Sequence, residues 1–406
     1  MKILEINKFN FANAGADKHF LDLVKLLRAK GNDVAVFAMD HSRNEFSPWK
    51  KYFLSYVGYN HNDSTLWQKI KGAFRMFYSW EARRKIGKLL DDFQPDIVHI
   101  HNIYHQISPS ILSEIKKRGL PIVMTVHDYA LICPDYLMEC NGKNWEEIKK
   151  GGWLSFVTNK CFKDSYVKSL IAILRFNFHK YLDIYDKNID LYISPSIFTK
   201  NILVQNGLAE NKIIVLPHFH TMELSDGCDK NANKERYVFY AGRISADKGV
   251  GELIGTFKKL ENITLYLAGK KDENFILEET ENIKYIGFLS HKGIMRYIKN
   301  SLFVVSFSRL PETFGLVALE AASQAKPFIG FDSGAYGEII EDGKDGYLCR
   351  NTDEIREKIE KLSEDEGLRI LFSRNALKKA ERFDRRQYYL NIMDIFSDSS
   401  RKSKRA

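Results

Sequence analysis

Short apolar strands alternate with amphipathic helices along most of this chain. Residues 2–6 predict a strand, residues 20–31 a helix that stops at Gly31, and residues 33–39 the next strand. A β-loop-α-β unit of this kind opens a parallel, doubly wound sheet, because neighbouring parallel strands must be joined through a crossover.

The alternation occurs in two series, which predicts an α/β protein with two Rossmann-like parallel-sheet domains. A chain of 406 residues is too long for one hydrophobic core. We expect one domain over residues 1–217, a polar linker over 218–236 and a second domain over 237–381. A helix over 382–397 and a disordered basic tail over 398–406 complete the prediction. Two successive sheets of this kind place a ligand cleft between them, at the carboxyl ends of the strands.

The composition is that of a globular protein, with 44% apolar and 28% charged residues. No run of about 18 apolar residues predicts a membrane-spanning helix, and the N-terminal residues lack the apolar core of a signal peptide. Five cysteines are scattered through the chain: Cys133, Cys140, Cys161, Cys228 and Cys349. We therefore expect reduced thiols and a cytoplasmic protein.

The excess positive charge lies in the first half of the chain. Residues 1–217 contain 30 Lys and Arg against 22 Asp and Glu, whereas residues 218–406 contain 31 against 30. A basic half of this kind predicts attraction to anionic lipid head groups or phosphates, and a solvated lysine-rich face is the equally weighted alternative. A helix predicted at 165–185 mixes apolar and basic residues, which fits either a membrane surface or packing on its own domain.

The segment 311–321, PETFGLVALEA, falls where a strand ends and a helix begins. A helix N-terminus offers backbone N–H groups and the positive end of a dipole, and Gly315 lets the backbone approach a ligand, so an anion such as phosphate is the expected guest. Glu320 is then placed to accept hydrogen bonds from vicinal hydroxyls. Glu312 is placed to face the group that is attached to the phosphate. The alternative is a surface Glu and a Glu favoured at a helix start.

A second candidate site is AGRISADKGV (241–250), where Arg243 and Lys248 lie five residues apart in a loop after a strand and can clamp a diphosphate. In the first half, His127 ends the strand of TVHDY (125–129) and can bind a sugar hydroxyl or move a proton, although a structural His is the alternative. Gly15 lies in the loop before the first helix and permits close approach of a ligand. His99 and His101 alternate on their strand, and we assign them no chemistry.

Taken in order, these segments resemble the retaining GT-B glycosyltransferases of family four, a group that includes bacterial polysaccharide and lipopolysaccharide enzymes. The matching segments of the second half are AGRISADKGV (241–250), LAG (267–269), PETFGLVALEA (311–321) and SGAYGEIIEDGKDGYL (333–348). Those of the first half are AGADKHFLDLVKLLRAKGNDVAVF (14–37), PDIVHIHN (95–102), TVHDYALICP (125–134), SPSIFTKNIL (194–203) and VLPHF (215–219).

The resemblance implies that Arg243 and Lys248 hold the diphosphate of the donor. The backbone amides of Phe314, Gly315 and Leu316 would assist them at the start of the helix. Members of the family need no metal, because the positive clamp neutralises the leaving diphosphate.

The same resemblance assigns the sugar and nucleotide contacts. Glu320 would bind the nucleotide ribose, Glu312 the donor sugar and His127 the sugar from the first domain, while Gly15 would line the loop near donor and acceptor. The last helix of such folds crosses back to the first domain, as residues 389–396 are expected to do.

The chain departs from the family pattern in three places. Ser333-Gly334-Ala335 replaces a double glycine, and Pro217-His218-Phe219 replaces the usual Pro-Asn-Gly. Relatives with the HDY segment often have further cysteines downstream, so we expect no disulfide or metal role for the three cysteines between 133 and 161.

The predicted function is retaining, metal-independent transfer of a hexose, without a cofactor, from a UDP- or GDP-linked sugar to a glycan or lipid-linked acceptor. The expected place is the cytoplasm, at the inner face of the cell membrane if the basic domain contacts lipid. A non-catalytic sugar-nucleotide-binding partner of another transferase is the alternative, and the presence of all the charged site residues argues against it. No nucleic-acid partner is expected, because the sequence contains no RRM, KH or helix-turn-helix pattern.

Overall fold

The computed structural model describes residues 1–57, 72, 74–220, 236–260 and 262–405. The chain forms two compact units, which are described separately. Unit 1 comprises Met1–Pro195, Lys200–Leu216 and Tyr389–Ala406, and unit 2 comprises Ser196–Thr199 and Pro217–Tyr388. Most of the expected linker, residues 221–235, lies outside the described residues, and so does Cys228.

Unit 1 is built on a six-stranded parallel sheet with the strand order β2-β1-β3-β4-β7-β8. Its strands are β1 (Lys2–Ile6), β2 (Asp33–Phe37), β3 (Ile97–Ile100), β4 (Ile122–Thr125), β7 (Leu191–Ser194) and β8 (Ile213–Val215). Its helices are α1 (Gly15–Ala29), η1 (Lys50–Tyr52), α3 (Trp80–Phe93), α4 (Ser110–Lys116), α5 (Trp145–Lys150), α6 (Gly152–Thr158), α7 (Tyr166–Tyr181), α8 (Ile197–Gln205) and η2 (Glu210–Lys212). The order of the strands confirms the doubly wound α/β fold that the alternating pattern predicts.

Unit 2 repeats this plan with a parallel sheet of order β11-β10-β9-β12-β13-β14. Its strands are β9 (Tyr237–Ala241), β10 (Thr264–Ala268), β11 (Ile283–Tyr285), β12 (Val304–Val305), β13 (Phe328–Phe331) and β14 (Gly346–Cys349). Its helices are η3 (Ala246–Lys248), α9 (Val250–Phe257), α10 (His291–Asn300), α11 (Leu316–Ser323), α12 (Tyr336–Ile339), α13 (Thr352–Glu364), α14 (Glu366–Ala380) and η4 (Glu381–Phe383), and α15 (Arg385–Arg405) follows.

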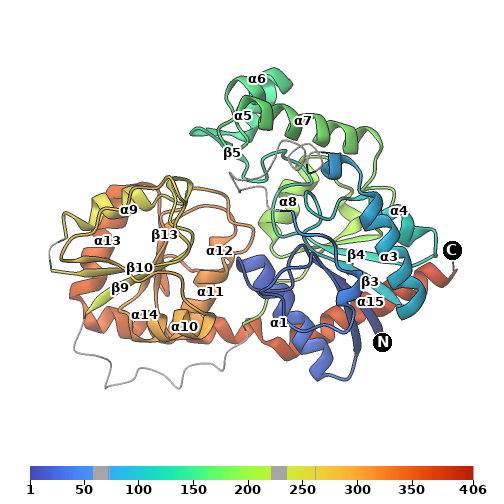
Figure 1. The fold of residues 1–406 in the computed structure, drawn as a ribbon. Helices are drawn as coiled ribbons and strands as arrows, with labels where there is room; N and C mark the ends of the chain where they lie inside the picture. Colours follow the sequence, from blue (N-terminus) through green and yellow to red (C-terminus); the bar gives the residue numbers. More distant parts are fainter. Residues whose placement is uncertain (58–71, 73, 221–235, 261, 406) are drawn as a thin grey trace. The chain divides into compact units, whose positions relative to one another are not determined.

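The sheet of unit 2 is buried on both faces, as Figure 1 shows. Val238 and Tyr240 of β9 point into the core formed with α9 and α13, whereas Tyr237 and Phe239 point into the core formed with α10, α11 and α14. Successive side chains of a strand face opposite sides, so a strand between two helical layers must be apolar throughout. This explains why the strands of this unit are continuous apolar runs in the sequence.

Between β4 and β7, unit 1 contains a small substructure that the sequence pattern did not predict. It consists of a two-stranded hairpin, β5 (Glu139–Cys140) and β6 (Lys143–Asn144), with α5 and α6 grouped at one end of α7 (Figure 1). A disulfide joins Cys140 to Cys161. The expectation of reduced thiols is therefore wrong for these two cysteines, because the hairpin and α6 bring together residues that are 21 positions apart.

Helix α7 has two apolar faces. Ala172 and Ile173 are buried, whereas Leu170, Leu174 and Phe178 are exposed. The exposed apolar side chains follow the helical repeat and continue onto α6: Trp153, Leu154, Tyr166, Val167, Leu170, Leu174, Phe178 and Tyr181. Packing on its own unit thus accounts for one face of α7 and leaves the other in solvent. Within the described residues, no helix is long and apolar enough to cross a bilayer.

The chain ends in helix α15, which corrects the expectation of a disordered tail from residue 398. The helix continues to Arg405 because its last turns are part of unit 1 and pack within it. The Ser403 hydroxyl donates to the Gly119 carbonyl at 2.7 Å, and the ring of Phe396 packs edge-on against His99 with centroids 5.2 Å apart. Tyr389 Oη accepts a hydrogen bond from Asn32 at 3.2 Å.

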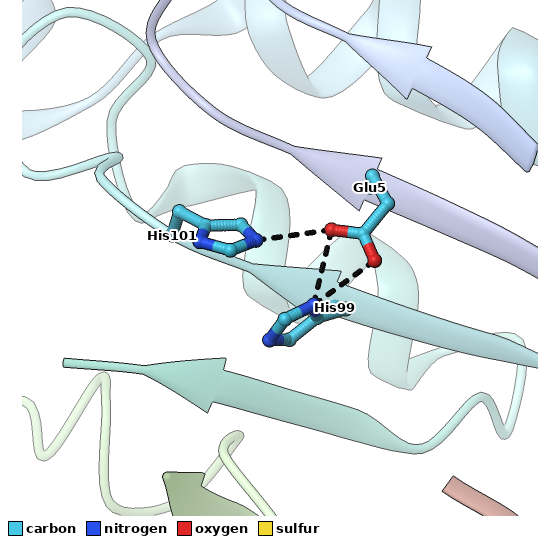
Figure 2. A group of neighbouring side chains, drawn as sticks. All are labelled: Glu5, His99 and His101. Carbon is cyan, nitrogen blue, oxygen red and sulfur yellow. Dashed lines mark hydrogen bonds and ion pairs between the residues drawn. The ribbon is translucent and has the colours of Figure 1, made fainter. Parts of the chain in front are cut away.

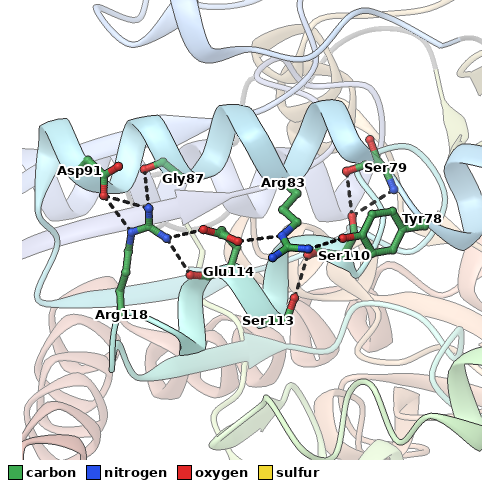
Figure 3. Close-up of polar contacts among 9 residues, drawn as sticks. All are labelled: Tyr78, Ser79, Arg83, Gly87, Asp91, Ser110, Ser113, Glu114 and Arg118. Carbon is green, nitrogen blue, oxygen red and sulfur yellow. Dashed lines mark hydrogen bonds and ion pairs between the residues drawn. The ribbon is translucent and has the colours of Figure 1, made fainter.

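A polar network joins α3 to α4 on unit 1 (Figure 3). The carboxylate of Glu114 accepts from Arg83 Nε at 2.8 Å and from Arg118 Nη1 at 2.7 Å. Arg118 also pairs with Asp91 at 2.9 Å, and Arg83 donates to Tyr78 Oη at 2.6 Å. The hydrogen bond from Arg118, and to a smaller extent the one from Arg83, lowers the pKa of the Glu114 carboxyl below its ordinary value.

We expect Glu114→Gln to destabilise the protein by about 0.5–1 kcal/mol at pH 7, the range of a surface ion pair. The pKa of Glu114 is lower in the folded chain, so its contribution is present above the unfolded pKa and is lost as the pH falls through the folded pKa. The difference in urea midpoint between the two proteins should shrink from pH 7 to pH 3. Glu357→Gln is the control, because that carboxylate is 67% exposed and pairs only with its neighbour Lys358 among the ion pairs described.

The disulfide predicts how many cysteine thiols of the denatured protein react before and after reduction. Denatured, unreduced protein should present three reactive thiols, and five after reduction. Cys161→Ser should lower the free energy of unfolding by about 3 kcal/mol, the loop-closure value for a loop of this length. Five thiols without reductant would show that the cysteines are reduced, as the sequence alone predicts.

Candidate active site

The strand order of unit 2 brings two of the predicted segments to one place. The strand order reverses at β9, since β10 and β11 lie on one side of it and β12 to β14 on the other. In an open α/β sheet ligands bind beyond the carboxyl ends of the strands at such a switch point. The loop after β9 contains Arg243 and Lys248, and the segment after β12 contains Glu312. The two loops are neighbours in space because their strands pair directly.

The charged side chains of these loops pair with one another. Lys248 Nζ lies 2.5 Å from Glu312 Oε1 and 3.4 Å from Ser308 Oγ. Arg243 pairs with Asp247 one turn away in the same loop. The side chains of Lys248 and Glu312 are each one-quarter exposed, so an anion arriving from solvent can compete for Lys248.

Gly315 allows the turn that starts α11. Its φ of 95° lies in the left-handed region, and a Cβ at this position would come within 2.8 Å of two ring atoms of Tyr336. Phe314 is buried against His218 and Phe383, with ring centroids at 5.0 and 5.8 Å, so only its backbone is available to a ligand. The first turn of α11, beginning at Leu316, has backbone N–H groups without helical partners.

The backbone of Glu312 is held by the segment before α12. Gly334 has φ 67°, and a Cβ there would collide with the backbone of Glu312. Ala335 N donates to Glu312 O at 2.9 Å. The Ser-Gly-Ala sequence therefore keeps a glycine at the position that touches Glu312, although the family's first glycine is absent.

Glu320 lies on α11 beside the start of α10. Its Oε1 is 3.0 Å from His291 Nε2, and only 13% of its side chain is exposed. His291 is the first residue of α10, after the N-cap Ser290. Sequence analysis did not single out His291, because nothing in its neighbourhood indicated that α10 and α11 would bring it to Glu320.

In unit 1, His127 is hydrogen-bonded to a buried polar network of Glu5, His99 and His101. Figure 2 shows these three network residues. His127 Nε2 lies 2.7 Å from His101 Nδ1, and His101 Nε2 lies 3.0 Å from Glu5 Oε2. His99 Nδ1 is 3.0 Å from both Glu5 oxygens, and His99 Nε2 is 2.8 Å from Thr125 Oγ1. Glu5, His99 and His101 have no solvent exposure.

The charge state of this network follows from its partners. Burial alone would raise the pKa of Glu5, but His99 and His101 outweigh it and lower the pKa to about 2. Burial and the neighbouring His99 lower the pKa of His101 to about 4. Candidate ligand atoms of Glu5, His99 and His101 lie within 4.8 Å of one another, a spacing that a metal ion could also span. His99 and His101 each form a hydrogen bond with Glu5. These bonds are sufficient to explain the close spacing of the three side chains, so we describe them as a hydrogen-bonded network.

Gly15 occupies a different position from the one expected. It is the first residue of α1, not a loop residue, and Ala14 is the N-cap. The loop before it is held by Asn7, whose amide donates to Phe9 O and to Asp17 Oδ1, both at 2.9 Å. The helix starts early because this buried contact ties the first turn of α1 to the end of β1.

The family models match both halves of the chain. The model for "Glycosyltransferase Family 4" matches residues 14–222, and the model for "Glycosyl transferases group 1" matches residues 228–379. This chain belongs to glycosyltransferase family 4.

Similar proteins cover the chain to different extents. An uncharacterized glycosyltransferase of Methanocaldococcus jannaschii is 24% identical over 98% of this chain and 99% of its own length. The capsular polysaccharide biosynthesis glycosyltransferase CapM of Staphylococcus aureus is 30% identical over 47% of this chain and 56% of its own. The N,N'-diacetylbacillosaminyl-diphospho-undecaprenol alpha-1,3-N-acetylgalactosaminyltransferase of Campylobacter jejuni is 28% identical over 59% of this chain and 68% of its own.

Solved structures confirm that this family 4 chain has the GT-B fold. A sucrose-phosphate synthase from Thermosynechococcus elongatus aligns with a TM-score of 0.70 and 14% identity, covering 98% of both chains. Anabaena HepE, in complex with UDP-glucose, aligns with a TM-score of 0.65 and 17% identity, covering 98% of this chain and 100% of its own.

For this family 4 protein, the structure brings Lys248 and Glu312 into contact and places Arg243 in the same loop as Lys248. It places Phe314, Gly315 and Leu316 at one helix start. His127 lies in unit 1 and is hydrogen-bonded to His101, which links it through Glu5 to His99. Sequence analysis assigned no role to Glu5, His99 or His101. The only signal for this network was the spacing of the two histidines, since residues i and i+2 of a strand share a face.

Gly315→Ala should destabilise unit 2 by about 1–3 kcal/mol, because alanine is strained at this φ and its Cβ meets the Tyr336 ring. The measurement is urea unfolding. Gly251→Ala is the matched control, since Gly251 lies in α9 with open space around its added Cβ and should be neutral or slightly stabilising. Equal stability of the two variants would contradict the proposed turn.

Proposed function

We propose that this glycosyltransferase moves a hexose, with retention of configuration, from a UDP- or GDP-linked sugar to a lipid-linked glycan acceptor in surface polysaccharide biosynthesis. The proposed site residues are His127, Glu312, Arg243 and Lys248, with Glu320, Gly15 and the amides of Phe314, Gly315 and Leu316 contacting the donor.

The observation that carries the proposal is the pair of loops at the switch point of unit 2. A nucleotide-sugar reaction leaves a diphosphate, whose growing negative charge needs cations and N–H groups placed in advance. Lys248 and Arg243 supply the cations, and the first turn of α11 supplies the N–H groups. This positive set supports the proposal of metal-independent catalysis, because it would do what a divalent ion does in other transferases.

The ion pair between Lys248 and Glu312 suggests how the donor is recognised. An incoming phosphate would take hydrogen bonds from Lys248, and the carboxylate of Glu312 would then accept hydrogen bonds from the sugar hydroxyls. Glu312 in this role orients the donor. The acceptor proton passes to an oxygen of the leaving phosphate, so no protein nucleophile is required.

The relatives support the choice of substrates. CapM acts in capsular polysaccharide biosynthesis, and the Campylobacter jejuni relative is named for a diphospho-undecaprenol substrate. HepE, of the same fold, was crystallised with UDP-glucose. These names favour a nucleotide-sugar donor and an acceptor on a lipid carrier.

A non-catalytic sugar-nucleotide-binding partner of another transferase is the second candidate. It would bind a donor through the same Lys248 and Glu320 but would not transfer or hydrolyse it. Turnover therefore separates the two functions, whereas binding alone does not.

The test begins with thermal shifts against UDP, GDP and ADP and their common sugars, which identify the base by mass action. Transfer is then measured with the donor so identified. Lys248→Ala should lower kcat roughly 100-fold, the usual cost of losing one group that stabilises the developing charge. Glu320→Ala should weaken nucleotide binding, and excess EDTA should leave activity intact.

The control is Lys259→Ala, which removes an exposed lysine of the same unit that follows α9 and precedes the amino end of β10, at the edge of the sheet opposite the two loops. Wild-type turnover of Lys248→Ala would remove Lys248 from the clamp. Donor binding without transfer or hydrolysis would favour the non-catalytic partner. The anomeric configuration of the product, read by NMR, should equal that of the donor, and inversion would overturn the retaining mechanism.

We infer that unit 1 meets an anionic membrane through the exposed face of α6 and α7. The exposed apolar side chains of α6 and α7 are accompanied by exposed Lys163, Lys168 and Lys180. An amphipathic helix with lysines beside apolar side chains lies at the interface of anionic bilayers. The inner face of the cell membrane is the proposed place of action, in keeping with the proposed lipid-linked acceptor.

Leu174→Gln should weaken binding to vesicles containing anionic lipid about tenfold, since it removes one inserted apolar side chain. Leu371→Gln is the matched control, because Leu371 of α14 has the same 52% exposure as Leu174 and lies in unit 2. Sedimentation with anionic and with neutral vesicles measures both. Equal binding of the two variants would rule out α7 as the membrane contact.

A further inference from the structure

An open hollow of about 300 Å³ lies beside α3 and α4 of unit 1, where the polar network of Figure 3 forms part of its lining. The indole of Trp80, which is 74% exposed, also lines it. Four cationic and two anionic side chains complete the charged lining: Arg83, Arg84, Lys88, Arg118, Asp91 and Glu114. The hollow therefore has an excess of two positive charges next to an exposed aromatic ring, and the proposed transfer reaction uses none of these groups.

The two carboxylates of the hollow are already paired with two of its arginines. Glu114 binds Arg83 and Arg118, and Asp91 binds Arg118. Arg84 and Lys88 are exposed, and within the part of the chain that the structure describes neither forms an ion pair. They lie four residues apart on α3, so they share one face of the helix. The uncompensated charge of the hollow is therefore that of Arg84 and Lys88.

Aromatic contacts connect this hollow to the exposed face of α7. The ring of Phe77 packs edge-on against Phe178 of α7 with centroids 5.7 Å apart, and the Phe77 carbonyl oxygen lies 3.2 Å from His179 Nε2. The ring of Tyr78 packs against Trp80, with centroids 4.8 Å apart. The start of α3 thus lies beside the end of α7, and the rest of α3 leads away from it (Figure 1). Trp80 continues the row of exposed apolar side chains on α7.

The spacing of side chains along α3 matches the depth of a lipid head-group layer. A helix rises 1.5 Å per residue, so Arg84 and Lys88 follow Trp80 by about 6 and about 12 Å. The Cα–Cβ bonds of a helix lean toward its N-terminus, so both cations lean toward Trp80. Head groups add about 5–8 Å to each side of the hydrocarbon layer, and tryptophan concentrates at the boundary between the two. With Trp80 at that boundary, the two cations reach the depth of the lipid phosphates.

We propose that this hollow binds the phosphate of an anionic lipid head group, with Arg84 and Lys88 as its charge contacts and Trp80 as its anchor in the membrane interface. The guanidinium of Arg84 matches phosphate oxygens with two parallel hydrogen bonds, and Lys88 adds a point charge. The occupant is a lipid and not a free anion, because an exposed tryptophan and the apolar face of α7 adjoin the cations. The proposal rests on the membrane contact of α6 and α7 proposed above and adds a charge-selective contact to it.

Unit 2 provides a matched pair of cations. Arg374 and Lys378 are also exposed and lie four residues apart on α14, and among the described residues they too form no ion pair. Arg374→Gln/Lys378→Gln therefore removes the same two charges, in the same order and spacing, as Arg84→Gln/Lys88→Gln. Both double variants reduce the net charge of the protein equally, so a difference between them reports the hollow and not the overall attraction to an anionic surface.

The experiment is sedimentation of the full chain with vesicles of phosphatidylcholine, with and without phosphatidylglycerol. Arg84→Gln/Lys88→Gln should weaken binding to the anionic vesicles roughly 25-fold, about fivefold for each cation near the surface, and leave binding to neutral vesicles unchanged. Trp80→Gln should weaken binding to both kinds roughly tenfold, since it removes an inserted ring. The α14 double variant should stay within about twofold of the wild type, because charges outside the contact are screened by salt.

Two results with the double variants would overturn the proposal. One is wild-type binding of Arg84→Gln/Lys88→Gln to anionic vesicles, and the other is an equal loss in the α14 pair, which would show long-range attraction alone. A free anion is tested by adding inorganic phosphate to the wild-type assay. We expect it to reduce vesicle binding no more than sodium chloride of the same ionic strength, and a much larger reduction would assign the hollow to free phosphate and refute the lipid.

Leu174→Gln separates this proposal from the one on which it rests. Loss of binding in Leu174→Gln but not in Arg84→Gln/Lys88→Gln would refute the lipid site in the hollow and leave the contact of α7 intact. Loss in neither would refute the membrane contact as a whole. Donor hydrolysis, measured without vesicles, should be the same in Arg84→Gln/Lys88→Gln and the wild type. Its absence in the wild type would refute the transferase function without changing the result for the lipid.

Discussion

Parallel pairing of strands is the constraint on which the rest of this structure depends. In a parallel sheet all strands end at one edge, so loops that follow different strands meet there whatever their separation in the chain. Lys248 and Glu312 are 64 residues apart and in contact for this reason. The same rule joins Glu5, His101 and His127, which lie on or just after three paired strands.

Charges at these edges are compensated within each unit. In unit 2 the cations of the proposed clamp are held by carboxylates at the surface, where a ligand can exchange with them. In unit 1 the carboxylate of Glu5 is fully buried, where an uncompensated charge would be costly. Two imidazoles donate to it, and its pKa stays low. The first arrangement lets the cations exchange partners with solvent, whereas the second holds the rings of His99 and His101 by buried hydrogen bonds.

Much of the fold was predictable from sequence because each strand is an apolar run and each helix an amphipathic one. The loops after β9 and β12 could be singled out as candidate ligand loops, since Gly315 and the charged residues near it are local signals. The buried network was not predictable, because Glu5 looks like an isolated charge in an apolar strand and its partners are more than 90 residues away. The disulfide between Cys140 and Cys161 was missed because the hairpin that aligns them consists of two-residue strands. The helical end of α15 was missed because its order comes from contacts with unit 1.

The sequence by itself determined the α/β class and the two domains and singled out the segments that we propose contact a nucleotide sugar, because these depend on short-range patterns of apolar, glycine and charged residues. Only the tertiary structure decided which charges pair, which cysteines form the disulfide and which buried groups are hydrogen-bonded to His127. Those contacts depend on strand order and register, which bring together residues that no local pattern connects.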